Sequence, residues 1–154
     1  MFASIFILCF SVAALLYWAR HACLSLLRSA RTQAEEAERV AEANRLEFQR
    51  VRRQLEVSAD PSSYDRLRDA LCHDFLALTY LLRYAATVNV GRYSNDERLL
   101  IADFHLMRLV YRMSRAFSPR AARYALLEMA SILEYFAAVM SRRMTAFSAK
   151  MMEA

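Results

Sequence analysis

The amino-acid sequence predicts an all-α protein, and two features of its composition support that prediction. The chain of 154 residues contains one glycine, Gly91, and two prolines, Pro61 and Pro119. Hairpins, bulges and tight turns depend on glycine, proline and Asn-Gly pairs, so a chain this poor in them is not expected to form a sheet. With 57% hydrophobic and 24% charged residues, it can bury a core between amphipathic helices.

The expected architecture has three parts. Residues 1–19 are predicted to be a single transmembrane helix, which continues into an extended charged helix over residues 20–59. Residues 61–154 are predicted to form a three-helix antiparallel bundle in the cytoplasm. If the charged helix joins these three, the result is a four-helix bundle overall.

The transmembrane prediction rests on an uncharged run over residues 2–18, FASIFILCFSVAALLYW. A helix of this length reaches roughly 25 Å, the short end of what crosses a bilayer core of about 30 Å. Tyr17 and Trp18 end the run, where aromatic rings favour the membrane interface. We therefore expect residues 2–18 to contact lipid. A cleaved signal peptide and a buried apolar helix are the alternatives, but a signal peptide needs a basic start and no lysine or arginine precedes Arg20.

The orientation of this anchor follows from the charges beside it. Arg20 follows the uncharged run and is expected at the membrane interface with Tyr17 and Trp18, and Arg28 and Arg31 come after it. Positive charge concentrates on the cytoplasmic side of membrane helices. The sequence therefore predicts an outside N-terminus and a cytoplasmic location for the rest of the chain, as in a protein of the bacterial inner membrane.

The charged helix over residues 20–59 carries a coiled-coil-like seam. Its apolar positions fall at intervals of 4, 7, 3 and 4, as the heptad pattern requires. These positions are Ala37, Ala41, Phe48, Val51 and Leu55. The pattern predicts binding of a protein partner, or self-association, through residues 31–58.

Three helix starts are marked in the second part of the chain. Asp60 before Pro61 and Ser118 before Pro119 each combine an N-cap residue with a proline at the first helical position. Ser94 with Glu97 forms a capping box, and Gly91 suits the end of the preceding helix. Short connections predict antiparallel neighbours. A straight helix over residues 20–59 would then place the Pro119 turn at the pole far from the bilayer.

Histidine and carboxylate side chains occur together on two of the predicted helices. Asp69 precedes His73 by one turn, and Asp103 precedes His105. Such pairs could supply metal ligands, but the chain has neither paired Glu-x-x-His motifs nor HExxH. A metal- or cofactor-binding bundle is therefore the weaker alternative. Glu128 and Glu134 are expected at the edge of an apolar stripe or paired with arginines of another helix.

Positive charge gathers in two places. All charged residues between Phe104 and Leu127 are arginines: Arg108, Arg112, Arg115, Arg120 and Arg123. They form either an ordinary solvated face or an interaction site; nucleic acid is not the expected partner, because no recognised motif accompanies them. Arg142 and Arg143 lie on a Met- and Phe-bearing helix end, which would rest on anionic headgroups or fray.

Taken together, these patterns predict a membrane-anchored helical interaction or scaffold protein, not an enzyme. A single glycine cannot form a glycine-rich phosphate loop, and no nucleophile has a recognisable partner. The alternatives are a helical bundle that binds a metal or cofactor through His73 and His105, and an accessory subunit of a larger membrane complex.

Overall fold

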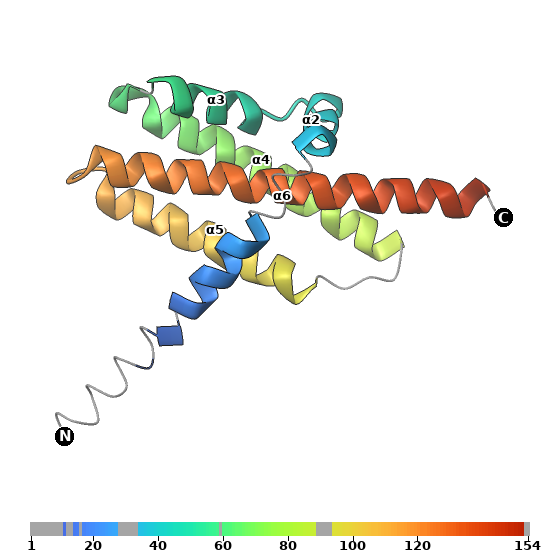
Figure 1. The fold of residues 1–154 in the computed structure, drawn as a ribbon. Coiled ribbons are helices and arrows are strands. Elements are labelled where there is room, and N and C mark those ends of the chain that lie inside the picture. Colours follow the sequence, from blue (N-terminus) through green and yellow to red (C-terminus); the bar gives the residue numbers. More distant parts are fainter. Residues whose placement is uncertain are drawn as a thin grey trace.

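The computed structural model describes residues 11, 14–15, 17–27, 34–58, 60–88 and 94–152 (Figure 1). Within these residues the secondary structure is helical and contains no strand, so the prediction of an all-α fold is confirmed. Residues 17–27 are helical and precede the named elements. These are α2 (Ala34–Ala43), α3 (Phe48–Ser58), the short 3-10 helix η2 (Pro61–Ser63), α4 (Tyr64–Val88), α5 (Asn95–Ser114) and α6 (Pro119–Met152).

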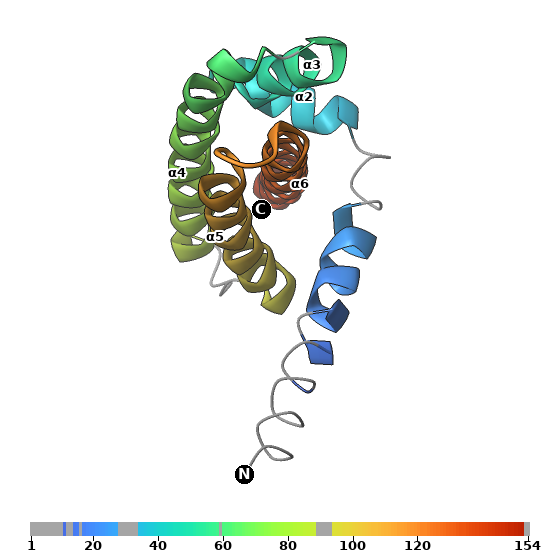
Figure 2. The same ribbon diagram turned by 90° about the vertical axis from the view of Figure 1, so that its left-hand side faces the viewer.

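Helix α6 is the centre of the fold. It contacts α2, α3, α4 and α5, and the view along its axis shows these helices placed around it (Figure 2). Most of its middle is apolar and buried, as expected for a helix surrounded by others. Residues with no exposed surface include Ala122, Ala125, Leu126, Met129, Ala130, Ile132, Leu133, Phe136, Ala137 and Ala138. The many alanines allow the neighbouring helices to approach closely.

The segment Pro119–Ala146 of α6 is also long and apolar enough to cross a membrane. However, 72% of the apolar 18-residue stretch within this segment is buried inside the protein, as in the core helix of a globular bundle. The predicted transmembrane run over residues 2–18 lies largely outside the described residues. Of its last members, Tyr17 and Trp18 are described and exposed.

The expectation of one continuous helix over residues 20–59 is wrong. Helix α2 ends at Ala43, and Arg45 adopts a left-handed backbone conformation with φ of 53°. The N–H of Leu46 donates to the carbonyl of Ala41 at 2.9 Å, and the N–H of Arg45 donates to that of Glu42 at 3.3 Å. This pair of hydrogen bonds is a Schellman motif, which normally places glycine where Arg45 stands.

A side chain from another helix stabilises the start of α3 after this break. The carboxylate of Asp74, on α4, accepts hydrogen bonds from the backbone N–H groups of Glu47 and Phe48, each at 2.7 Å. Both donors lie at the first turn of α3, where no carbonyl within the helix can reach them. Asp74 therefore acts as an N-cap supplied through tertiary structure.

The residues of the predicted seam are buried, but inside their own chain. Their exposed fractions lie between 0% and 4% for Ala37, Ala41, Phe48, Val51 and Leu55. They belong to α2 and α3, both of which contact α6. The seam thus contributes to the hydrophobic core and leaves no apolar stripe of its own for a coiled coil between chains.

The predicted starts of the later helices are confirmed. Asp60 accepts from the N–H of Ser62 at 3.2 Å, and Glu97 accepts from the N–H of Ser94 at 3.1 Å. The hydroxyl of Ser118 accepts from the N–H of Ala121 at 3.3 Å. Gly91, the predicted end of the preceding helix, lies outside the described residues.

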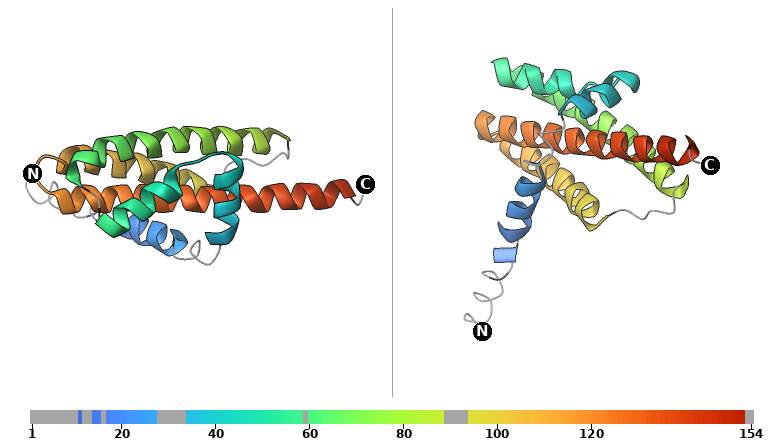
Figure 3. Two further views of the ribbon diagram at one scale, coloured as in Figure 1. Left: turned by 90° about the horizontal axis from the view of Figure 1, so that it is seen from above. Right: turned by 45° about the vertical axis from the view of Figure 1, so that its right-hand side comes forward.

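Helix 17–27 crosses the bundle instead of extending it. It is steeply inclined to α6 and runs, from residue 27 to residue 17, toward the end where α5 and α6 are joined (Figures 1 and 3). The expected two-pole geometry depended on a straight rod over residues 20–59, and the break after α2 removes that rod. The Pro119 turn therefore lies on the side toward which helix 17–27 runs, not at a pole remote from it.

Candidate functional site

Charged side chains from three helices meet where helix 17–27 crosses α5 and α6. The guanidinium of Arg20 donates to Oδ1 of Asp103 at 3.2 Å, to the carboxylate of Glu128, and to the hydroxyl of Tyr124 at 3.1 Å. It also lies 5.8 Å from the centroid of the Tyr124 ring, within the range of a cation–π contact. Sequence reasoning assigned Arg20 to the membrane interface and missed these partners.

The two carboxylates in this group are buried. Asp103 and Glu128 are each 5% exposed, and one oxygen of each, Oδ2 and Oε1 respectively, has no hydrogen-bond partner. Burial, together with the charge of Glu128, raises the pKa of Asp103. Burial alone would lower the pKa of Arg20, but the interactions with Glu128, Tyr124 and Asp103 together outweigh it and raise that pKa. A single arginine thus bonds to two buried acids.

The rest of the contact between helix 17–27 and the bundle is made by a few apolar side chains. Cys23 and Leu27, three and seven residues after Arg20, are buried on the same face of the helix. Burial and the nearby charge of Asp103 raise the pKa of Cys23 to about 12. The thiol is therefore uncharged near neutral pH and packs as a small hydrophobic group.

Two further ion pairs connect buried glutamates to other helices. Arg52 of α3 pairs with Glu134 of α6, and Arg143 of α6 pairs with Glu97 of α5. Of the two arrangements expected for Glu128 and Glu134, the edge of an apolar stripe or pairing with arginines of another helix, the structure shows the pairing. Being six residues apart, these two glutamates point to different neighbours, one to helix 17–27 and the other to α3.

The residues named as weak candidates for a metal site are not brought together. The side chain of Asp69 is 67% exposed and pairs with Arg68, while that of His73 is 85% exposed. Asp103 is bonded to Arg20, and His105 lies with its ring edge-on to Phe75, 5.5 Å between centroids. Among the described residues, no three His, Cys, Asp or Glu side chains are grouped so that they could hold a metal ion.

The five arginines between Phe104 and Leu127 divide into two groups. Arg115 pairs with Asp65 at 2.9 Å. Arg123 donates to the backbone carbonyls of Leu55 at 2.9 Å and Glu56 at 3.2 Å, near the C-terminal end of α3. These two arginines join helices to one another. Of the other three, Arg108 is half-buried, and Arg112 and Arg120 are exposed.

Arg142 and Arg143, predicted to contact headgroups, lie on the half of α6 opposite the α5–α6 turn. Arg143 is bonded to Glu97, as described above, and Nε of Arg142 lies 3.5 Å from the Ala138 carbonyl of the same helix. Figure 1 shows this half of α6 extending away from helix 17–27. The geometry therefore separates these two arginines from Tyr17 and Trp18.

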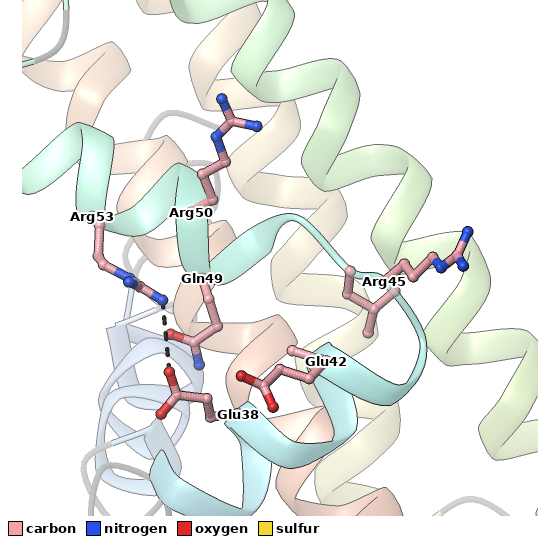
Figure 4. Close-up of a pocket in the computed structure, with 8 residues that line it drawn as sticks. Glu38, Glu42, Arg45, Gln49, Arg50 and Arg53 are labelled. Atoms are coloured by element: carbon pink, nitrogen blue, oxygen red, sulfur yellow. Dashed lines mark ion pairs between the residues drawn. The ribbon is translucent and has the colours of Figure 1, made fainter.

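A polar groove lies at the corner between α2 and α3, within the region predicted to bind a partner (Figure 4). Glu38 and Arg53 form an ion pair across it at 3.6 Å. Arg45 and Arg50 also line the groove, but their guanidinium groups point away from Glu38 and Glu42 (Figure 4), and both residues are exposed. The surface that α2 and α3 present outward is therefore charged and of mixed sign.

Apolar side chains are exposed on two of the bundle helices. On α4, Leu76, Tyr80 and Tyr84 are 65–70% exposed and follow one another at intervals of four residues, so they share one face. On α5, exposed apolar residues occur at Leu109 and Met113. Monomeric proteins seldom expose contiguous apolar faces, so these faces are candidate contact surfaces.

Comparison with known proteins adds no relative: no family model, no curated protein and no solved structure matches this chain. Function is therefore argued from the contacts themselves. Chemically, the Arg20 group can fix the position of one helix, but its only cation is already bonded to its two acids. The arrangement suits a structural connection better than catalysis.

Proposed function

We propose that the protein is a single-pass membrane protein that presents a helical bundle to partners at the cytoplasmic face and has no catalytic role. The observation that carries this proposal is the position of Arg20. It lies two residues after Trp18, at the end of the uncharged run, and is bonded to α5 and α6. The same helix that would leave the membrane is thus part of the bundle.

A direct connection of this kind has a mechanical consequence. A bundle on a flexible linker would rotate freely above the bilayer, whereas one bonded to its anchor holds a fixed orientation. The aromatic residues Tyr17 and Trp18 suit the interface, and the positive charges beyond them favour a cytoplasmic bundle. Fixed orientation suits a scaffold, because it limits which surfaces a partner at the membrane can reach.

The outer surface of α2 and α3 is the first candidate for the protein contact. The apolar seam of these helices is buried against the core, so a partner or second copy would meet the charged outer surface instead. Its mixed charges include Glu38, Glu42, Arg50 and Arg53. Electrostatic complementarity would then govern specificity and association rate more than affinity.

A second candidate function, that of an accessory subunit in a larger membrane complex, is favoured by the exposed face of α4. Leu76, Tyr80 and Tyr84 offer a continuous apolar strip of the kind that packs against another subunit. Tyrosine is enriched in such contacts because it combines a large apolar ring with a hydroxyl group.

The anchor is tested by membrane fractionation of the full chain. Arginine at the centre of the apolar run, in Phe10→Arg, costs roughly 2.5–3.5 kcal/mol of insertion free energy, so the protein should shift to the soluble fraction. Leu76→Arg is the matched control, because it adds the same charge to an exposed residue of α4 and should leave the protein in the membrane. A C-terminal reporter that is active only in the periplasm should stay silent. Soluble wild-type protein, or an active reporter, would overturn the proposal.

The two contact surfaces are separated by affinity purification from detergent extract. Arg50→Glu with Arg53→Glu inverts charge on the α2–α3 surface, and Tyr80→Glu places a charge in the apolar strip of α4. Loss of the co-purifying protein with the first change alone supports the scaffold with a charged contact. Loss with Tyr80→Glu alone supports the accessory subunit.

A further inference from the structure

The outward surface of α5 carries a stripe of apolar side chains that nothing in the described chain covers. Leu106, Leu109 and Met113 are 40%, 55% and 67% exposed, and their spacing of three and four residues puts them on one face. Phe117 follows in the turn before α6 and is 88% exposed. We call these four residues the α5 outer face.

This face lies on the side of the bundle toward which helix 17–27 runs. Two views at right angles show α5 between α6 and the side toward which helix 17–27 runs (Figures 1 and 2). The surface of α5 that is directed away from α6 therefore faces the same side. Phe117 belongs to the turn that joins α5 to α6, at the end of the bundle toward which residue 17 points (Figures 1 and 3). The exposed aromatic residues Tyr17 and Trp18 therefore share this side with the α5 outer face.

The charges beside the α5 outer face are positive. Arg112 precedes Met113 and Arg120 follows Phe117 by three residues, and both are exposed. Arg115 is partly offset by Asp65, but no acidic residue occurs in the sequence between Phe104 and Leu127. Apolar side chains flanked by arginines are typical of surfaces that lie in the interface of an anionic membrane.

We propose that the α5 outer face rests on the cytoplasmic surface of the bilayer that holds residues 2–18. Its apolar side chains would enter the headgroup region, and Arg112 and Arg120 would contact anionic phospholipid. The inference rests on the proposed membrane anchor, which brings this side of the bundle to the lipid. In this arrangement anionic phospholipid is the binding partner of Arg112 and Arg120.

The other exposed apolar strip does not share this geometry. Helix α4, which exposes Leu76, Tyr80 and Tyr84, lies on the opposite side of α6 from helix 17–27 (Figure 2). Because α4 and α5 both expose large apolar side chains, α4 serves as an internal control for lipid contact by α5. A preference for lipid should distinguish α5 from α4 even though both expose large apolar side chains.

The test uses tryptophan fluorescence of the full chain in vesicles whose phosphatidylcholine and phosphatidylglycerol carry brominated acyl chains, which quench nearby indoles. Trp18 is the only tryptophan, so the wild-type protein reports on the anchor. Trp18→Phe with Met113→Trp reports on the α5 outer face, and Trp18→Phe with Tyr80→Trp reports on α4. Circular dichroism checks that each variant retains the helical signal of the wild type.

We expect the brominated lipid to reduce the fluorescence of wild-type protein and of the Met113→Trp variant, and to leave the Tyr80→Trp variant unchanged. Quenching at Trp18 but not in the Met113→Trp variant would overturn this inference while preserving the anchor. Absence of quenching at Trp18 would remove the anchor and this inference with it. Equal quenching of the Met113→Trp and Tyr80→Trp variants would show general embedding in lipid, which also overturns it.

The role of the arginines is tested separately. Vesicles of brominated phosphatidylcholine alone, or Arg112→Glu with Arg120→Glu in the mixed vesicles, should reduce quenching in the Met113→Trp variant and leave that of Trp18 intact. Unchanged quenching would contradict the assignment of anionic lipid. If the Met113→Trp variant is shielded from aqueous iodide but not quenched by lipid, a protein covers this face and the inference is wrong.

Discussion

Helix 17–27 and α3 both pack against the central helix, and each is joined to it by an arginine on a buried glutamate. Arg20 pairs with Glu128, and Arg52 pairs with Glu134. The surroundings of the two pairs differ. In α3 the ion pair accompanies three core residues that are at most 3% exposed, Phe48, Val51 and Leu55.

The backbone ends of α3 are also satisfied by neighbouring helices. Asp74 accepts from its first amides, and Arg123 donates to carbonyls near its end. In helix 17–27 only Cys23 and Leu27 are buried as apolar groups, while Arg20 bonds to two acids that each retain an unpartnered oxygen. We infer that hydrophobic burial stabilises the packing of α3 on the bundle, whereas a charge cluster stabilises the packing of helix 17–27.

The largest expected effect is that of Arg20→Met. Removing one partner from a buried ion pair leaves uncompensated charge, which costs about 3–5 kcal/mol. The free energy of unfolding of the full chain in mild detergent, measured by denaturant titration, should fall by that order. Arg53→Met removes an exposed arginine of the surface pair with Glu38 and should change it little.

A companion variant sharpens this prediction. Arg20→Met combined with Asp103→Asn and Glu128→Gln removes the buried negative charge along with the positive one. This variant should recover much of the stability lost by Arg20→Met alone. If the single substitution is as harmless as Arg53→Met, the charge cluster does not hold helix 17–27 and the comparison with α3 fails.

The next effect is expected in α3. Leu55→Ala removes a fully buried side chain and leaves a cavity against the core, which should cost about 3 kcal/mol in the same titration. Val57, two residues away, is 84% exposed, and Val57→Ala should stay within about 0.5 kcal/mol of the wild type. Equal effects of the two changes would mean that α3 is not held by burial.

A smaller effect is expected at the cap of α3. Asp74→Ala removes the acceptor for the N–H groups of Glu47 and Phe48, and loss of an N-cap costs about 1–2 kcal/mol. Asp74→Asn keeps an acceptor oxygen and should recover most of this loss. Protection of the Phe48 amide from hydrogen exchange should fall in the alanine variant only; unaltered protection would contradict the capping role.

The smallest effect concerns pH. Burial raises the pKa of Asp74 above its ordinary value of 3.8, although the two backbone N–H donors act against it. The folded protein therefore binds this proton more tightly than the unfolded chain, and the associated stability is present below 3.8 and lost as pH rises through the raised pKa. Thermal unfolding from acidic to neutral pH should show wild-type protein losing stability relative to Asp74→Asn. A difference that is constant with pH would mean that the pKa of Asp74 is not raised.

Local signals predicted much of the fold. Starts of helices at Asp60, Ser94 and Ser118 depend on residues within one turn, so they are readable from the sequence alone. The break after α2 is not, because Arg45 takes a position usually held by glycine, and the start of α3 is capped by Asp74, 26 residues beyond Phe48. A helix end stabilised by a distant side chain leaves no local pattern.

The candidate site was harder to predict for the same reason. The partners of Arg20 lie 83 and 108 residues along the chain, at Asp103 and Glu128, and no spacing rule connects them. The buried glutamates of α6 did indicate that arginines must approach, because unpaired charge is costly inside a protein. The charge pattern could not show that, of the clustered arginines, Arg115 and Arg123 bond to other helices.

The central position of α6 has a consequence for how the protein forms in the cell. Translation proceeds from the N-terminus, so helices α2 to α5 emerge from the ribosome before the helix around which they pack. Residues such as Phe48 and Leu55 cannot be fully covered until Pro119–Met152 has been synthesised. Final assembly of the bundle is thus delayed to the last part of synthesis, and ribosomes stalled before α6 should hold a nascent chain that proteases and chaperones recognise as unfolded.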